Sequence, residues 1–231
     1  MNVEPRGIYG DIHISENLAR LNDRLEDVCN RCGRRISDIR VIAVTKNQSV
    51  SSVRAAYDNG ICDFAENRVQ EAERKYTGLI EIRPHIRLHM VGHLQSNKAG
   101  ESTKIFDIIH SVDSVKLAGI LNEKAVGQFK VLLQVNVAGE QTKSGFLIDE
   151  VGSALERVRA MPSLRVEGLM TIAPIAENSL EVRLVFAKLR ELKDKYGLRE
   201  LSMGMTDDYE VAIEEGSTMI RIGRAIFGER R

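Results

Sequence analysis

Short apolar segments alternate with helix-compatible segments eight times along this chain, and this alternation constrains the fold more than any other feature. The apolar segments have roughly four to seven residues and the others roughly ten to eighteen, which is typical of parallel β-α-β units. The expected strands span 41–44, 62–65, 88–91, 106–109, 131–137, 166–170, 201–203 and 219–222. The expected helices span 15–33 (with Ser15 as N-cap), 49–59, 67–77, 96–101, 114–126, 148–160, 178–195 and 207–215.

Two architectures fit eight strands joined by right-handed helical crossovers, an open doubly wound sheet and a closed barrel. No dinucleotide-binding glycine fingerprint follows the first strand, and eight strands match the closed form. We therefore expect an α/β fold with a single (β/α)8 TIM-barrel-like domain. Residues 1–36 would form an N-terminal arm and helix packed on the barrel, and residues 37–231 would form the barrel itself.

The composition restricts the class of protein. Hydrophobic residues make up 43% of the 231 residues and charged residues 29%, which fits a globular protein and excludes a disordered chain. Lys and Arg total 33, as do Asp and Glu, so no net charge favours binding to nucleic acid or an anionic membrane. No apolar run approaches the roughly eighteen residues of a membrane span, and the first residues do not resemble a signal peptide. We expect a soluble, cytoplasmic protein.

The cysteines and histidines give no sign of a metal site or a disulfide framework. Cys29 and Cys32 spell C-x-x-C, but they fall within an expected helix and no second pair follows. We interpret them as ordinary helix positions, and Cys62 as a small core residue that opens a strand. His89 and His93 straddle a strand and its loop, so they do not share a helix face as metal-binding pairs do.

Polar and glycine-rich segments follow the expected strands, and in a barrel these segments meet at one mouth. Lys46 closes the first strand, where partial burial would lower its pKa and expose an amine that can attack an aldehyde. From position alone, a solvated lysine at a strand–loop junction remains the better interpretation. Segments 202–204 and 222–224 follow the last two strands, where barrels commonly bind phosphate, although two ordinary loop glycines would look the same.

A set of longer motifs accompanies these strand ends. They are Val44-Thr45-Lys46, ENRVQE at 66–71, HMVGHLQSNK at 89–98, IHSVDS at 109–114, Val135-Asn136 with KSGF at 143–146, GLMTI at 168–172, LSMGMTDD at 201–208 and RIGRAIFG at 221–228. Each motif is weak alone. Together, in this order and over about residues 38–228, they closely resemble the pyridoxal 5′-phosphate homeostasis protein family, whose fold is like the N-terminal barrel of alanine racemase.

The resemblance implies a type III pyridoxal 5′-phosphate (PLP) fold with PLP held as an internal aldimine on Lys46. It places Asn67 beside the cofactor ring and Arg221 at the pyridine nitrogen, where an arginine leaves the nitrogen unprotonated and weakens the electron sink. It also implies that the Ser202 side chain and backbone N–H groups after the last strand hold the phosphate. The predicted cofactor-binding residues are Lys46, Asn67, His89, Met170, Ser202, Arg221, Gly223 and Arg224.

The chain departs from the family pattern at two positions. Ala65 stands where the family usually has glycine, before Glu-Asn. Arg224 stands where the family usually has threonine or serine, so a hydroxyl contact to phosphate is lost while the backbone contacts survive.

Two functions remain open at this point, a PLP carrier and a small PLP-dependent amino-acid racemase. They share Lys46, but racemisation needs a second acid/base group on the opposite face of the substrate. Only Glu229, Arg230 and Arg231 follow Gly228, so we expect no second domain of the kind that supplies a catalytic tyrosine in alanine racemases. We therefore favour the carrier, a monomer or weak homodimer, with apo PLP-dependent enzymes as candidate recipients.

Overall fold

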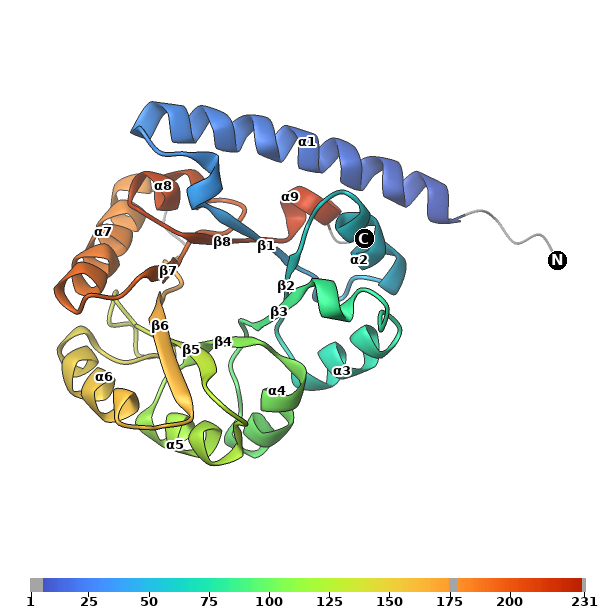
Figure 1. The fold of residues 1–231 in the computed structure, drawn as a ribbon. Helices are drawn as coiled ribbons and strands as arrows, with labels where there is room; N and C mark the ends of the chain where they lie inside the picture. The colour runs from blue at the N-terminus through green and yellow to red at the C-terminus, as the bar shows by residue number, and fades with distance from the viewer. Residues whose placement is uncertain (1–5, 175–177, 230–231) are drawn as a thin grey trace.

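Parallel strands close into a barrel in the order β1 to β8, and helices surround it (Figure 1). The computed structural model describes residues 6–174 and 178–229. Each strand pairs with the next in sequence and β8 pairs with β1, which confirms the expected eight-stranded barrel. The strands are β1 (Arg40–Val44), β2 (Asp63–Glu66), β3 (Arg87–Met90), β4 (Ile108–Val112), β5 (Phe129–Gln134), β6 (Leu164–Met170), β7 (Glu200–Ser202) and β8 (Met219–Ile222).

Three of the described helices begin directly after a side chain that caps their first turn. Ser49, Ser114 and Asn178 each accept a hydrogen bond from a first-turn backbone N–H, and α2, α5 and α7 start directly after them. The helices are α1 (Arg6–Cys32), α2 (Val50–Asp58), α3 (Val69–Thr77), α4 (Ala99–Ile105), α5 (Val115–Lys124), α6 (Val151–Arg159), α7 (Ser179–Lys195), α8 (Tyr209–Glu214) and the unexpected α9 (Arg224–Phe227).

Helix α1 is longer than the sequence pattern indicated. Ser15 lies inside the helix, so its prediction as the N-cap was wrong. The helix continues through this position because apolar residues recur every three or four positions on the face that packs against the barrel. The buried residues of this stripe include Ile14, Leu18, Leu21, Leu25 and Val28. As Figure 1 shows, α1 lies across α2, α8 and α9.

Strand β4 starts two residues later than expected, and this changes the position of His110. Asp107 does not enter the strand, because its backbone N–H donates to the Leu88 carbonyl and its carboxylate accepts from the Leu88 N–H. At its other end Val112 pairs with Leu133 on β5, so the strand includes His110 and Ser111, which the sequence pattern had placed after its end. Both are fully buried.

The apolar core has an outer layer between strands and helices and a smaller inner layer inside the barrel. The inner layer consists of Ile42, Ala65, Val91, Leu132, Met170 and Met219. Polar side chains occupy much of the remaining interior, among them His89, His110, Ser202 and Arg221. Buried polar groups need hydrogen-bond partners. These side chains therefore bond to one another inside the barrel, and the bonds fix their positions near the candidate site.

The cysteines agree in part with their interpretation. Cys29 and Cys32 are helix positions in α1, one buried and one half-buried, and both are free thiols. Cys62 precedes β2 and is exposed, so its prediction as a core residue that opens a strand was wrong. No helix of the described residues is both long enough and apolar enough to cross a membrane.

Candidate functional site

The segment after β1 presents Lys46 from a tightly anchored turn. Thr45 is fully buried; its N–H donates to the Ala65 carbonyl and its Oγ1 lies 2.7 Å from Glu66 Oε1. Lys46 follows and is half-buried. Asn47 adopts a positive φ of 61°, and its N–H donates to Glu71 Oε1 at 2.5 Å. Anchors on both sides of Lys46 therefore fix the backbone that carries its amine.

A buried lysine ties this turn to helix α3. The Lys75 ammonium lies 2.5 Å from Glu66 Oε1 and 3.0 Å from Glu71 Oε1, and it also donates to the Thr45 carbonyl. Burial raises the pKa of Glu66. Although burial opposes it, hydrogen bonds from Asn47 and Lys75 lower the pKa of Glu71. Sequence reasoning missed this cluster, although the four-residue spacing of Glu71 and Lys75 on a helix is a recognisable signal for an ion pair.

Arg221 on β8 is held by three hydrogen bonds inside the barrel. Its Nη1 donates to the Ser202 carbonyl oxygen and to Ser202 Oγ, both at 2.7 Å, and its Nη2 donates to the Thr171 carbonyl at 2.8 Å. Burial lowers the pKa of Arg221 to about 10, a shift that Asp208 opposes. The guanidinium is therefore a fixed cation at neutral pH.

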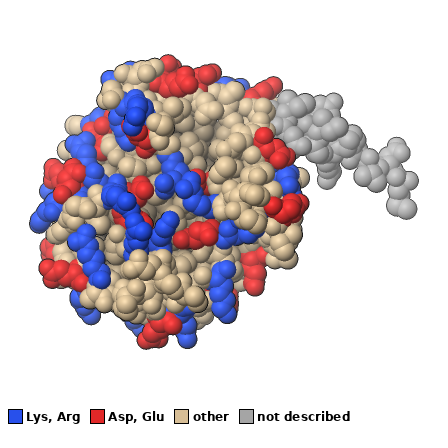
Figure 2. All heavy atoms as spheres, viewed as in Figure 1, with Lys and Arg blue, Asp and Glu red and all other residues tan. Residues whose placement is uncertain are grey.

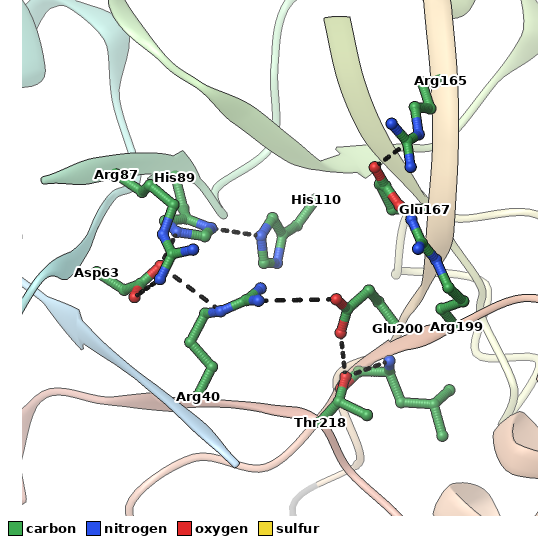
Figure 3. Close-up of polar contacts among 11 residues, drawn as sticks. Arg40, Asp63, Arg87, His89, His110, Arg165, Glu167, Arg199, Glu200 and Thr218 are labelled. Carbon is green, nitrogen blue, oxygen red and sulfur yellow. Dashed lines mark hydrogen bonds and ion pairs between the residues drawn. The ribbon is translucent and has the colours of Figure 1, made fainter. Parts of the chain in front are cut away.

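From Arg221 a chain of hydrogen bonds runs down the barrel interior to Asp63. Ser202 Oγ lies 2.8 Å from His110 Nδ1, His110 Nε2 lies 2.8 Å from His89 Nδ1, and His89 Nε2 lies 2.9 Å from Asp63 Oδ1. Figure 3 shows His89 between Asp63 and His110. Burial lowers the pKa of both imidazoles, that of His110 strongly. Both rings are therefore neutral, and each carries one N–H.

The two ends of the chain determine the direction of every hydrogen bond in it. Hydrogen bonds from His89 and Arg87 lower the pKa of Asp63 in spite of its burial, so this carboxylate only accepts, and His89 donates through Nε2. His89 Nδ1 then accepts from His110 Nε2, and His110 Nδ1 accepts from the Ser202 hydroxyl. The Ser202 proton is thus committed to His110, while Ser202 Oγ accepts from Arg221.

The remaining predicted residues lie at different depths. Asn67 is half-buried after β2, and its backbone packs so closely on Gly92 that a Cβ on this glycine would lie 2.2 Å from the Asn67 carbonyl oxygen. Met170 is fully buried in the inner apolar layer. His89 is also fully buried, and both of its ring nitrogens have protein partners. Direct cofactor contacts for these residues remain predictions.

Gly223 and Arg224 follow β8, next to the end of β1. A Cβ on Gly223 would have only Val44 within 4 Å, the nearest atom being its carbonyl oxygen at 3.6 Å. Among the described residues, no group accepts a hydrogen bond from the backbone N–H of Gly223 or of Arg224. The Arg224 side chain is exposed and pairs with Asp207. Two uncommitted backbone donors therefore lie close to the segment that carries Lys46.

Strand pairing brings these groups together. β1 lies between β2 and β8, with Val44 opposite Ala65 and Ala43 opposite Ile222. Lys46, Asn67 and Gly223 therefore follow three adjacent strands at the carboxyl mouth of the barrel. An amine, a buried guanidinium and free backbone donors in one place form a site suited to an anionic ligand that carries an electrophilic carbon.

Comparison with known proteins places the chain in a family. The model of the alanine racemase N-terminal domain matches residues 17–231. The pyridoxal phosphate homeostasis protein of Aquifex aeolicus is 39% identical over 228 residues, which cover 94% of this chain and 98% of that protein.

Solved structures agree with this placement. PipY of Synechococcus elongatus, solved with PLP bound, superposes with a TM-score of 0.81 and 36% identity, covering 93% of this chain and all of PipY. Alanine racemase of Corynebacterium glutamicum shares the fold at a TM-score of 0.68 and 16% identity; the match covers 95% of this chain and 61% of the racemase. The chain belongs to the pyridoxal phosphate homeostasis protein family, built on the barrel of the alanine racemase N-terminal domain.

Proposed function

We propose that this chain binds PLP covalently through Lys46 and acts as a carrier in the homeostasis of this cofactor. The observation that carries the proposal is the meeting of Lys46, Arg221 and the uncommitted N–H groups of Gly223 and Arg224 at the adjacent ends of β1 and β8. The PLP-bound structure of PipY, which shares 36% of its residues with this chain, supports it.

The donor set fits PLP group by group. The N–H groups of Gly223 and Arg224 suit a phosphate, and the glycine leaves space for an oxyanion to approach. Arg221 suits the pyridine nitrogen, which only accepts a hydrogen bond when it is unprotonated. Ser202 belongs to the site through Arg221, since its carbonyl and hydroxyl oxygens hold the guanidinium. When bound, PLP supplies an aldehyde that condenses reversibly with a primary amine.

Lys46 is the residue that supplies this amine. Its backbone is fixed by Thr45 and Asn47, which are themselves bonded to Glu66 and Glu71. Lys46 itself is half-buried at the mouth of the barrel. A fixed backbone and a half-buried amine fit reversible capture of a cofactor.

We infer that the chain is a carrier and not a racemase. Arg221 stays protonated at neutral pH because its pKa is about 10, so it donates to the ring nitrogen and does not protonate it. An unprotonated ring stabilises a substrate carbanion poorly, which raises the barrier to proton abstraction. His89 and His110 cannot serve as the second acid/base group from where they lie, because both are fully buried and bonded on both nitrogens.

The covalent link is tested by borohydride reduction of the PLP-loaded protein, followed by peptide mapping. The pyridoxyl group should appear on the peptide that contains Lys46. Lys46→Ala should lose the visible absorbance of bound PLP, whereas Lys98→Ala, which changes another lysine near strand ends, should keep it. Labelling of a different lysine in the unaltered protein would overturn the assignment.

The carrier function is tested separately from binding. Loaded protein, mixed with D- or L-alanine in deuterated water, should show no enzymatic exchange of the α-hydrogen. The same loaded protein should restore the activity of an apo PLP-dependent enzyme. Exchange at enzymatic rates that Lys46→Ala abolishes would favour the racemase, and failure to load any apo enzyme would remove the delivery role.

A further inference from the structure

The amino-terminal end of the barrel, opposite the mouth that carries Lys46, has a concentrated group of charged side chains. The first residues of several strands point into this amino-terminal mouth, and Figure 2 shows Lys and Arg side chains around the middle of this face with carboxylates among them. We call this group the barrel floor. It consists of Arg40, Arg87, Lys130, Arg165 and Arg199 together with Asp63, Glu167 and Glu200.

The carboxylates of the barrel floor are well paired. Asp63 lies 2.6 Å from Arg87, and Figure 3 shows Glu167 between Arg165 and Arg199, at 3.0 Å and 2.6 Å. Glu200 accepts from the Thr218 hydroxyl at 2.6 Å. The five cations outnumber the three carboxylates by two. The barrel floor therefore has an excess of two positive charges, although the whole chain is neutral.

Two of the cations have donors to spare. Arg40 reaches toward Asp63 and Glu200, but both N···O distances are 3.8 Å, too long for hydrogen bonds. Figure 3 shows its guanidinium lying between these two carboxylates. Lys130 is exposed, and no described residue forms a hydrogen bond or ion pair with it. Their N–H groups are available to a ligand.

A cavity of about 220 Å³ collects these donors. Arg40, Arg87, Lys130, Arg165 and Arg199 all line it. Ile108, Leu132 and Met219 form apolar parts of its wall. Cations that converge on one concave surface raise the local concentration of anions there. Guanidinium groups present paired N–H donors that match the oxygens of an oxyanion.

We propose that the barrel floor is a binding site for a small oxyanion with two negative charges, of the inorganic phosphate class. Such an anion would neutralise the excess charge and accept hydrogen bonds from Arg40 and Lys130. The small cavity favours a compact ion over an extended organic acid. This site lies at the end of the barrel opposite Lys46, so it is independent of the proposed PLP site.

The test must report on the barrel floor itself, because phosphate would also be attracted to the N–H groups of Gly223 and Arg224. We would titrate the full chain with sodium phosphate and follow the side-chain Nε–Hε NMR resonances of Arg40 and Arg87, assigned with Arg40→Lys and Arg87→Lys. Sodium chloride at matched ionic strength is the salt control. A saturable shift with phosphate alone is expected.

Matched variants then locate the site. Lys130→Gln should weaken phosphate binding about tenfold, the effect of losing one charge-assisted contact. Lys116→Gln, which changes an exposed lysine on α5, should leave binding unchanged, and so should Lys46→Ala at the other mouth. Arg165→Gln gives a second measure if Lys130→Gln folds poorly. Equal shifts with chloride and phosphate, or equal affinity in well-folded Lys130→Gln and Arg165→Gln, would overturn the proposal.

Discussion

His89 Nδ1 and His110 Nε2 lie 2.8 Å apart in the interior of the barrel, with their rings nearly perpendicular at 75°. Two buried imidazoles can share a hydrogen bond only if one donates and the other accepts, so at least one must be neutral. Asp63, bonded to His89, and Ser202, bonded to His110, determine which nitrogen of each ring donates. The pair connects the floor of the barrel to the arginine at its opposite mouth.

The pH dependence of stability should report these neutral histidines. Their pKa values are lowered below 6.5 in the folded chain, whereas the unfolded chain titrates near 6.5. Below that pH the two histidines bind protons in the unfolded chain but remain neutral in the folded chain. Protonation therefore stabilises the unfolded chain, and the free energy of unfolding should fall as pH drops. Each histidine that stays neutral in the folded chain should contribute at most about 1.4 kcal/mol per pH unit, a slope that is approached only well below pH 6.5. Urea unfolding at several pH values between 8 and 5 measures the slope.

A variant isolates the contribution of His110. His110→Gln should reduce the slope between pH 6.5 and 5, because one titrating group is removed while an amide can still donate and accept. His85→Gln, which changes an exposed histidine, should leave the slope as it is. An unchanged slope in His110→Gln would show that His110 is not held neutral.

Replacing the buried Lys75 should lower the free energy of unfolding more than replacing its partner Glu66. Lys75→Met would leave two carboxylates, of which Glu66 is fully buried, without their cation. Loss of one partner of a buried ion pair typically costs about 3–5 kcal/mol. Glu66→Gln should cost less, because Glu66 Oε2 has no hydrogen-bond partner among the described residues and the amide oxygen can still accept from Lys75. Chemical denaturation compares the two variants, and an equal cost would contradict the asymmetry.

Helix α1 should be an integral part of the fold, although it precedes the barrel in sequence. We propose that α1 and the barrel unfold together, because Leu25 on α1 is fully buried in the same apolar core as the barrel helices. Leu25→Ala should lower the free energy of unfolding by about 2–5 kcal/mol. Leu184→Ala on α7, whose side chain is 63% exposed, should change it by less than about 0.5 kcal/mol. Two separate transitions in unaltered protein would show that α1 folds independently.

Periodicity located the strands because most of them contain a short apolar run between polar segments. Its errors lay at strand ends: β5 and β6 each start two residues earlier than expected and β5 ends three residues earlier, whereas at β4 the apolar residue Phe106 indicated too early a start. The actual start depends on hydrogen bonds between Asp107 and the backbone of Leu88, 19 residues away in the sequence. Contacts of this kind leave no periodic signal, so His110 was placed at the end of the strand and not inside the barrel.

The sequence predicted which residues belong to the candidate site, but not how deeply each of them is buried. Lys46 and Gly223 could be found because strand ends in a barrel share one mouth. The depth of Ser202 and His89 could not, because the direction of a hydroxyl or imidazole depends on partners from other strands. The barrel floor was missed for a similar reason. Arg40 and Lys130 are single polar residues at the starts of separate strands, and only closure of the barrel brings them together.

The phosphate contacts should depend on Gly223 and not on the Ser202 hydroxyl, whose proton is committed to His110. The readout is the ratio of the affinities for PLP and for pyridoxal, since these ligands differ only in the phosphate. Gly223→Ala should lower this ratio, because a methyl group would enter the space beside the N–H donors. Its free energy of unfolding should change little, since the φ of −115° suits alanine and the new Cβ would make only ordinary contacts with Val44. Ser202→Ala should instead lower the stability by about 1–3 kcal/mol, through the unpaired His110 and Arg221, and leave the ratio close to that of the unaltered protein. The opposite result, a ratio that falls in Ser202→Ala but not in Gly223→Ala, would contradict this prediction. It would mean that the Ser202 hydroxyl contacts the phosphate and that its hydrogen bond to His110 breaks when PLP binds.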